Sequence, residues 1–210
     1  LPERHLGLIQ ASEHEGLNLF LDNVANWLDL YIDIDKLLAL AKQREEILLQ
    51  KPIRQIIPIG QRVAIAKDVA FSFVYPSLME GWVNAGSEII PFSPLAGQGP
   101  CKSADAIYLP GGYPELYAGK LSSNGFLELL RLAATSGTAI FGECGGYMVL
   151  GNYLTDKDGS KHEMAGLLNL ETSFKSSKLH LGYREVTAQC DFLLGKKGSK
   201  FKGHEFHYAT

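Results

Sequence analysis

The segment that most constrains the fold of this chain is 138–150, with the sequence TAIFGECGGYMVL. Its first four residues predict a short buried strand, and the residues from Tyr147 onward predict a helix. Cys144 lies between them, with Gly142 and Gly146 two positions to either side. Strand, small-residue turn and helix in this order form the pattern of a nucleophile elbow, here with cysteine in the place of serine. Glycine is needed beside the tip because the backbone there is strained.

The elbow pattern also predicts the chemistry of Cys144. The helix that follows would point its first N–H groups and the positive end of its dipole toward the sulfur, which favours the reactive thiolate. The alternative is a buried structural cysteine after a strand. Because glycines flank the residue at the elbow spacing, we interpret Cys144 as a nucleophile.

The composition of the 210 residues sets further limits, with 46% of them hydrophobic and 20% charged. This is sufficient for one full domain with a smaller attached part. The formal net charge of −3 predicts neither a nucleic-acid partner nor an anionic membrane partner. The chain has three cysteines, Cys101, Cys144 and Cys190, and this odd, low number argues against a set of disulfides. It predicts a reducing compartment and so a cytoplasmic location. The sequence has no CxxC or HExxH pair and no apolar run of about 18 residues, so neither a metal site nor a membrane span is expected.

The pattern along the chain changes at Arg62. Residues 1–50 predict helices, with Asp33 or Asp35 as the cap of the second helix, and 51–60 predict a linker. After Arg62, short apolar runs alternate with helical periodicity, which predicts an α/β fold with a mostly parallel sheet. The predicted strands are 63–66, 88–92, 105–109, 138–141, 164–170 and 179–187. The predicted helical segments are 77–85 and 116–134, the second with a break near residues 122–125.

A second loop, 110–115 (PGGYPE), follows the third predicted strand and so lies at the same sheet edge as the elbow. Attack of a thiol on an amide creates an oxyanion, which needs preorganised N–H donors. We expect one donor at Gly145 and the other in Gly111 or Gly112, where no side chain blocks the approach. The alternative is a plain turn of glycine and proline. For Arg184, in a later predicted strand, a contact to a substrate carboxylate and a solvated side chain are both open.

Five short segments carry a resemblance to a known family: 1–8 (LPERHLGL), 66–73 (AKDVAFSF), 111–116 (GGYPEL), 142–146 (GECGG) and 203–208 (GHEFHY). Together they resemble the glutamine-dependent cobyrinic acid a,c-diamide synthases over nearly the whole chain. The resemblance implies the flavodoxin-like, three-layer α/β fold of class I glutamine amidotransferases, with a mostly parallel sheet, preceded by a short helical segment. It also implies that 1–58 are the helical end of an upstream synthetase domain with its linker. Residues 61–210 would be the glutaminase domain, truncated at its C-terminus.

The function implied by the resemblance is the supply of ammonia from glutamine for the ATP-dependent amidation of the a and c carboxylates of cobyrinic acid in cobalamin biosynthesis. ATP and Mg²⁺ would bind to the synthetase domain, since no G-x-x-x-x-G-K-[ST] occurs here, and no cofactor is expected in this chain. The expected partners are glutamine and, through the synthetase domain, the tetrapyrrole; a homodimer is left open. Two alternatives remain: a nickel-sirohydrochlorin a,c-diamide synthase, and a non-catalytic flavodoxin-like binding module.

The general base is the part of the site that this sequence leaves open. Class I glutaminases usually complete a triad with His-Pro-Glu, which this chain lacks. The resemblance implies a Cys-His pair instead. Its histidine would lie in a Ser/Thr-Tyr-x-His segment expected beyond Thr210. His207 and His204 are the fallback candidates. Strand alternation would place Glu205 on the face of His207, about 7 Å from any same-face neighbour, too far to orient a base. We therefore expect neither histidine to bond Cys144, and expect this chain alone to hydrolyse glutamine poorly.

Overall fold

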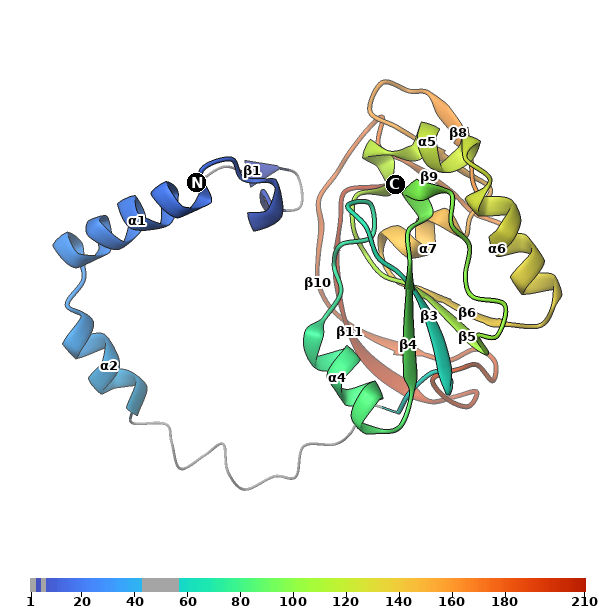
Figure 1. Ribbon diagram of the computed structural model, residues 1–210, viewed down its shortest axis with the longest axis horizontal. Helices are drawn as coiled ribbons and strands as arrows, with labels where there is room; N and C mark the ends of the chain where they lie inside the picture. Colours follow the sequence, from blue (N-terminus) through green and yellow to red (C-terminus); the bar gives the residue numbers. More distant parts are fainter. Residues whose placement is uncertain (1–2, 5–6, 43–56) are drawn as a thin grey trace. The chain divides into compact units, whose positions relative to one another are not determined.

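A computed structural model describes residues 3–4, 7–42 and 57–210 (Figure 1). The chain divides into two compact units, Leu1–Arg54 and Gln55–Thr210, which are described separately below. Most of the linker predicted at 51–60 lies outside the described residues. In the described part of the chain, no helix is both long enough and apolar enough to cross a membrane.

The first unit consists of short elements, of which two are the expected helices. These are β1 (Glu3–Arg4) and β2 (Gly7–Leu8), which pair antiparallel, a 3₁₀ turn at Ala11–Glu13, α1 (Leu17–Tyr31) and α2 (Ile34–Lys42). Asp33 caps the second helix, because its carboxylate accepts a hydrogen bond from the N–H of Lys36 at 3.0 Å. No residue of α1 is buried, and Leu30 keeps 79% of its surface exposed. A helix that is apolar but unburied lacks the packing that normally stabilises it.

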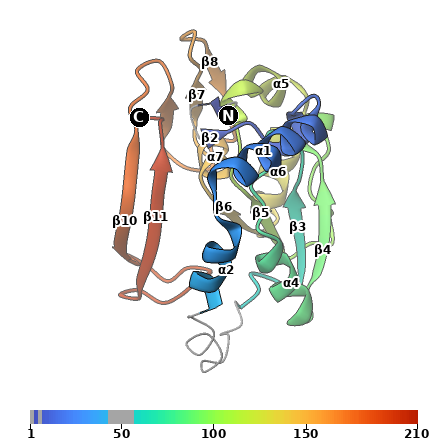
Figure 2. The same ribbon diagram turned by 90° about the vertical axis from the view of Figure 1, so that its left-hand side faces the viewer.

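The second unit is built on a four-stranded parallel sheet in the order β4-β3-β5-β6, which runs from right to left in Figure 2. The strands are β3 (Arg62–Ala66), β4 (Glu88–Phe92), β5 (Ala106–Leu109) and β6 (Ala139–Gly142). The two central strands are almost wholly buried, as expected for parallel strands covered on both faces. The four predicted strands of this region are confirmed to within one residue at each end.

Helices cover both faces of this sheet and give it three layers. The helices are α4 (Pro76–Asn84), α5 (Ala118–Ser123), α6 (Phe126–Thr135) and α7 (Gly145–Val149). On one face, Val63 and Tyr108 pack with Trp82 of α4. On the other face, Ile107 packs with Leu130 of α6 and with residues of α5 and α7. The break predicted near residues 122–125 is confirmed, because Gly125, with a φ of 84°, separates α5 from α6.

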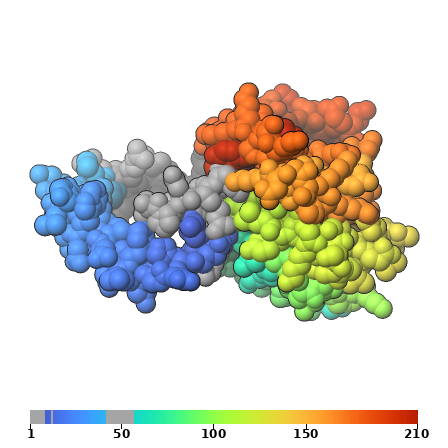
Figure 3. All heavy atoms as spheres, turned by 90° about the horizontal axis from the view of Figure 1, so that it is seen from above, coloured from blue at the N-terminus to red at the C-terminus, as the bar shows by residue number. Residues whose placement is uncertain are grey.

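The remaining strands form two small sheets outside the parallel one. The first has the order β8-β7-β9, and the second is the hairpin of β10 and β11. Their bounds are β7 (Tyr153–Thr155), β8 (Lys161–Glu163), β9 (Glu171–Ser173), β10 (His180–Thr187) and β11 (Lys200–His207). The prediction of a strand at 179–187 is thus confirmed. The hairpin and the end of the chain, orange to red, lie along one side of the second unit in Figure 3.

The prediction of a strand at 164–170 is wrong. Its backbone bonds run to the end of α7 and the residues just after it instead of to a neighbouring strand: the N–H of Ala165 donates to Val149, and that of Leu167 donates to Leu150. Gly166, with a φ of 65°, turns the segment between these two bonds. An apolar run can therefore be buried as a loop when a helix terminus supplies its hydrogen-bond partners.

Candidate active site

The loops that follow β3, β5 and β6 meet at the carboxyl edge of the parallel sheet. The N–H of Phe73, in the first loop, donates to the carbonyl of Gly111 in the second at 3.0 Å. The N–H of Gly146, in the elbow, donates to the carbonyl of Pro110 at 3.1 Å. Because main-chain bonds join these loops, the position of each is fixed by the others.

The loops after β3 and β4 are joined by a carboxylate that the sequence reasoning missed. Asp68 accepts hydrogen bonds from the N–H of Ala70 at 2.9 Å, the hydroxyl of Ser93 at 2.9 Å and the N–H of Leu95 at 2.8 Å. Its partners lie in different loops, so periodicity along the chain could not reveal them. Asp68 therefore links the fourth loop of this edge to the other three.

Cys144 occupies the tip of the turn between β6 and α7. Its φ of 51° and ψ of −113° make it the one non-glycine residue with positive φ in the described parts of the chain. A Cβ added to Gly146 would lie 2.0 Å from the carbonyl oxygen of Leu109, and one added to Gly142 would lie 2.8 Å from that of Gly146. Both flanking glycines are thus required by close backbone approach, and the backbone at the cysteine has the strained form of an elbow.

Two backbone N–H groups converge on the sulfur of Cys144, one from Gly145 and one from Gly112. A Cβ on Gly145 would lie 2.6 Å from the ring of Pro114, and one on Gly111 would lie 3.2 Å from the Cβ of Cys144. The glycines selected from the sequence therefore lie together around the cysteine. Their lack of side chains is what lets the two loops approach this closely.

The electrostatic surroundings of Cys144 differ from the expectation of a favoured thiolate. Burial raises the pKa of its thiol, and the negative charges of Glu143 and Glu115 raise it further. The N–H groups of Gly145 and Gly112 oppose this rise without reversing it. Because α7 has only five residues, its dipole is too short to outweigh burial of the sulfur.

A phenol–carboxylate pair lies next to the cysteine. The hydroxyl of Tyr108, a fully buried residue of β5, donates to Glu143 at 2.8 Å. Burial, the nearby charge of Glu143 and this hydrogen bond hold the pKa of Tyr108 well above its ordinary value. Burial and the charges of Glu143 and Cys144 also raise the pKa of Tyr75. One signal for this cluster is visible in the sequence, namely the acidic residue directly before Cys144.

The fallback base His207 lies in β11 with both ring nitrogens engaged. Nδ1 lies 2.9 Å from the carbonyl oxygen of Ala209, and Nε2 lies 3.0 Å from Oε1 of Glu205. The expectation that Glu205 is too distant to orient this histidine is wrong, because side chains two residues apart on one strand face bridge the gap. His204 lies on the other face, where its ring is 5.7 Å from that of Tyr183.

Arg184 forms an ion pair with Glu205, while its side chain remains 53% exposed. The hydrogen bond from His207 and then the charge of Arg184 lower the pKa of Glu205. Among the described residues, no hydrogen bond joins Arg184 or either histidine of β11 to Cys144. The hairpin residues selected from the sequence thus form a cluster of their own.

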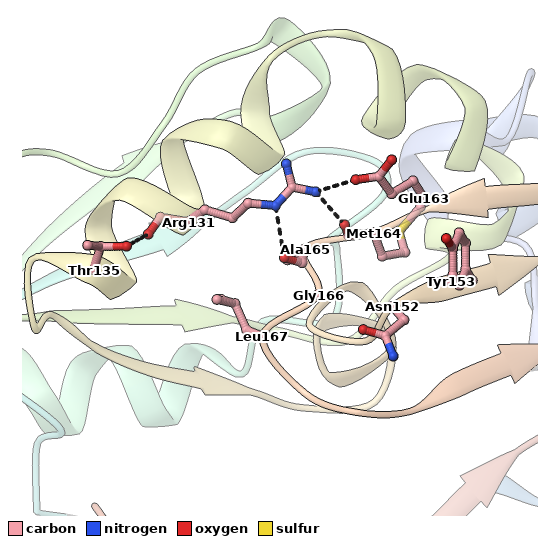
Figure 4. A pocket seen from close by; sticks show the side chains of 9 residues that line it. All are labelled: Arg131, Thr135, Asn152, Tyr153, Glu163, Met164, Ala165, Gly166 and Leu167. Carbon is pink, nitrogen blue, oxygen red and sulfur yellow. Dashed lines mark hydrogen bonds and ion pairs between the residues drawn. The ribbon is translucent and has the colours of Figure 1, made fainter.

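A surface hollow of about 530 Å³ lies between α6 and the segment after β8 (Figure 4). Arg131 crosses it, with its guanidinium donating to the carbonyls of Ala165 at 2.9 Å and Met164 at 2.8 Å and pairing with Glu163 at 2.8 Å. These bonds attach α6 to a segment without regular structure. The arginine is therefore engaged in holding the fold together.

Comparisons with known proteins give the family. The model of the CobB/CobQ-like glutamine amidotransferase domain matches residues 62–210. A hydrogenobyrinate a,c-diamide synthase of Agrobacterium fabrum (strain C58) is 49% identical over 211 residues, covering 100% of this chain and 48% of its own length. The protein of the same name from Brucella anthropi is 48% identical over 212 residues, with the same two shares.

The chain spans about half the length of the curated relatives it matches. The family match covers the parallel sheet, the elbow loop with Cys144 and the hairpin, and it excludes the first unit. With its three-layer α/β architecture and this match, the chain belongs to the family of CobB/CobQ-like glutamine amidotransferase domains.

Proposed function

We propose that this chain is the glutaminase part of an a,c-diamide synthase that amidates a cobyrinate-type tetrapyrrole in cobalamin biosynthesis. The observation that carries the proposal is the strained elbow at Cys144, on whose sulfur the N–H groups of Gly112 and Gly145 converge. A cysteine in this setting suits acyl transfer, which needs a nucleophile beside N–H donors that lie about 3 Å from the oxygen of the carbonyl it attacks.

The reaction begins with attack of the Cys144 sulfur on the side-chain amide carbon of glutamine. A carbon–sulfur bond forms, and the amide oxygen takes a negative charge that Gly112 and Gly145 stabilise. The nitrogen leaves as ammonia once it has received a proton, and a glutamyl thioester remains. Water then cleaves the thioester, releasing glutamate and restoring the thiol.

A general base has to remove the proton from the thiol, and the raised pKa of Cys144 makes this step necessary at neutral pH. We propose that the base is a histidine beyond Thr210. His207 is the weaker alternative, because it would first have to give up its contacts with Glu205 and Ala209. It follows that this chain alone should hydrolyse glutamine poorly.

The names of the relatives support hydrogenobyrinate as the tetrapyrrole, in preference to cobyrinic acid or nickel-sirohydrochlorin.

We place ATP and Mg²⁺ in the half of the enzyme that this chain does not span. The unburied apolar side chains of α1 and α2, such as Trp27 and Leu40 at 56% and 65% exposure, support residues 1–58 as the end of that synthetase domain. Residues 61–210 would then be the glutaminase domain, and its free cysteines support a cytoplasmic location.

The test uses the full-length enzyme with glutamine or ammonium chloride as the nitrogen source. We expect Cys144→Ala to abolish glutamine-dependent amidation and to leave ammonia-dependent amidation intact. The matched control Cys190→Ala should retain both, because Cys190 is exposed in a separate part of the fold. Glutamine-dependent turnover in Cys144→Ala, or a glutamine-analogue alkylator attached to another residue, would falsify the proposal.

The raised pKa of Cys144 also favours a second candidate, a binding module without catalysis. In that case the full-length protein would amidate its substrate with ammonia but not with glutamine. Formation of a glutamyl thioester on Cys144, trapped by rapid acid quench and detected by mass spectrometry, would rule this candidate out.

A further inference from the structure

One face of the β10–β11 hairpin gathers three residues that can coordinate a metal ion. His180 pairs with His207 across the two strands, and Gly182 pairs with Glu205. One nitrogen from each imidazole and one carboxylate oxygen all lie within 4.8 Å of one another. All three side chains are partly buried, so they combine a fixed position with access from solvent.

The hydrogen bonds of His207 leave one of its nitrogens suited to a cation. Nδ1 faces the carbonyl oxygen of Ala209 and must carry a proton to bond with it. In a neutral ring, Nε2 would then present a lone pair toward Oε1 of Glu205, 3.0 Å away, whereas in a protonated ring Nε2–H would donate to that oxygen. Two acceptors this close require a cation or a second ring proton between them. Neighbouring ligand atoms in a tetrahedral zinc site lie about 3.3 Å apart, and metal-bound histidines commonly donate their other N–H to a carbonyl.

The strand register places a glycine opposite Glu205. This glycine, Gly182, leaves space that the guanidinium of Arg184 fills, with Nη1 2.7 Å from where a Cβ of residue 182 would lie. Arg184 engages Oε2 of Glu205, which orients the carboxylate and leaves Oε1 directed at His207. In the described part of the chain, no hydrogen bond engages the ring of His180, which stacks on that of His207 with centroids 4.7 Å apart.

We propose that His180, Glu205 and His207 form a binding site for a divalent transition-metal ion of the zinc type. Two imidazoles and one carboxylate suit Zn²⁺, Co²⁺ or Ni²⁺ better than Mg²⁺ or Ca²⁺, which prefer oxygen ligands alone. Binding requires the ring of His180 to rotate out of its stack and the ligand atoms to close by about 1.5 Å, within side-chain motion. A fourth position stays open to water. The ligands come from two strands, which is why no local sequence spacing indicated a metal.

The site would hold the segment that follows β11 in place. His207 directly precedes the segment in which Ala209 is buried and Thr210 pairs with Ser173 of β9 through two backbone bonds of 2.8 and 3.0 Å. An ion that joins β10 to β11 would therefore hold the connection between the hairpin and the β7–β9 sheet. This role is independent of the glutaminase proposal, because none of its residues belongs to the elbow.

The test is a titration of chelator-treated full-length protein with Zn²⁺ by calorimetry, repeated with Co²⁺ to record its visible spectrum. We expect a site of one equivalent, and at least a tenfold weaker affinity in His207→Ala, His180→Ala and the isosteric Glu205→Gln. The matched control is His204→Ala, which removes a histidine from the opposite face of the same strand and should leave the affinity unchanged. Circular dichroism would confirm that each variant is folded.

Nitrogen-15 spectra of the histidine rings give a second readout that does not depend on the variants. On adding Zn²⁺, we expect the Nε2 signal of His207 to shift while Nδ1 keeps its proton. The proposal is overturned by the absence of a one-equivalent site, or by an affinity that His204→Ala lowers as much as His207→Ala does. It is also overturned if both nitrogens of His207 keep their protons in the presence of Zn²⁺.

Discussion

The elbow at Cys144 and the β10–β11 hairpin hold their candidate functional side chains by different physical means. At the elbow, main-chain bonds from three loops and glycines that admit no Cβ fix one partly buried cysteine. On the hairpin, cross-strand pairing and side-chain contacts set the positions of charged and aromatic side chains that are partly buried or exposed. The elbow therefore depends on backbone packing, whereas the hairpin depends on side-chain chemistry. Substitutions that add side-chain volume should therefore lower the free energy of unfolding much more at the elbow than in the hairpin.

The largest effect is expected from Gly146→Ala. Its new Cβ would lie 2.0 Å from the carbonyl oxygen of Leu109, which the backbone can relieve only by displacing β5 or α7. We expect a loss of about 3 kcal/mol or more in the free energy of unfolding. The matched substitution in the hairpin, Gly203→Ala, meets no atom within 4 Å. Its effect should stay within about 1 kcal/mol.

Chemical denaturation of both variants measures this difference. Equal losses in Gly146→Ala and Gly203→Ala would contradict the distinction between a packed region and an open one.

A smaller effect is expected from Tyr108→Phe, which removes the hydroxyl that donates to Glu143. Because a partly buried carboxylate then loses a donor, we expect a cost of roughly 1–2 kcal/mol. The control is Tyr183→Phe in the hairpin, where the tyrosine is 89% exposed and the midpoint of unfolding should not change. If Glu143→Gln abolishes the cost of Tyr108→Phe in a double-mutant cycle, the loss belongs to this hydrogen bond; full additivity would assign it elsewhere.

The pH dependence of alkylation compares the elbow thiol with an exposed one. Burial raises the pKa of Cys144, while a hydrogen bond with Ser103 lowers that of Cys101. Since the thiolate is the reacting form, the alkylation rate of Cys144 should rise at a higher pH than that of Cys101. Peptide mapping after timed exposure to iodoacetamide between pH 6 and about 10 gives both profiles. A profile for Cys144 at lower pH than that of Cys101 would show that the elbow activates the thiol by itself.

The smallest effect is expected from Arg184→Ala in the presence of a chelator. Arg184 is about half exposed in its ion pair with Glu205, so water can replace the lost contact and the change in the unfolding midpoint should be small. The same substitution should weaken Zn²⁺ binding modestly, because Glu205 loses the contact that orients it. A large destabilisation without metal would show that the hairpin, like the elbow, depends on its internal contacts.

The fold was more predictable from the sequence than the site. Strands such as β3 and β5 are short apolar runs between turns, so the local pattern is enough to find them. The run 164–170 has the same appearance, yet it becomes a loop because residues at the end of α7 and just after it accept its hydrogen bonds. That partner is distant in the sequence, and no local pattern contains it.

The same distinction applies within the site. Gly145 follows Cys144 directly, and its role at the sulfur could be predicted from the elbow spacing. The raised pKa of Cys144 could not, because it arises from burial and from Glu115 in a different loop. Likewise, Glu205 and His207 are adjacent on one face of β11, but only the strand register brings His180 beside them.

The proline of the outer strand β4 has a consequence for self-association. The N–H of Glu88 donates inward to Gln61, so alternation turns the nitrogens of Ile89 and Pro91 away from the sheet. Pro91 thus occupies an outward position at which another chain would need a donor, and it has none. A second molecule that added a strand to this edge of the sheet would lack one backbone hydrogen bond at Pro91. Pro91 therefore hinders edge-to-edge aggregation of this chain through β4.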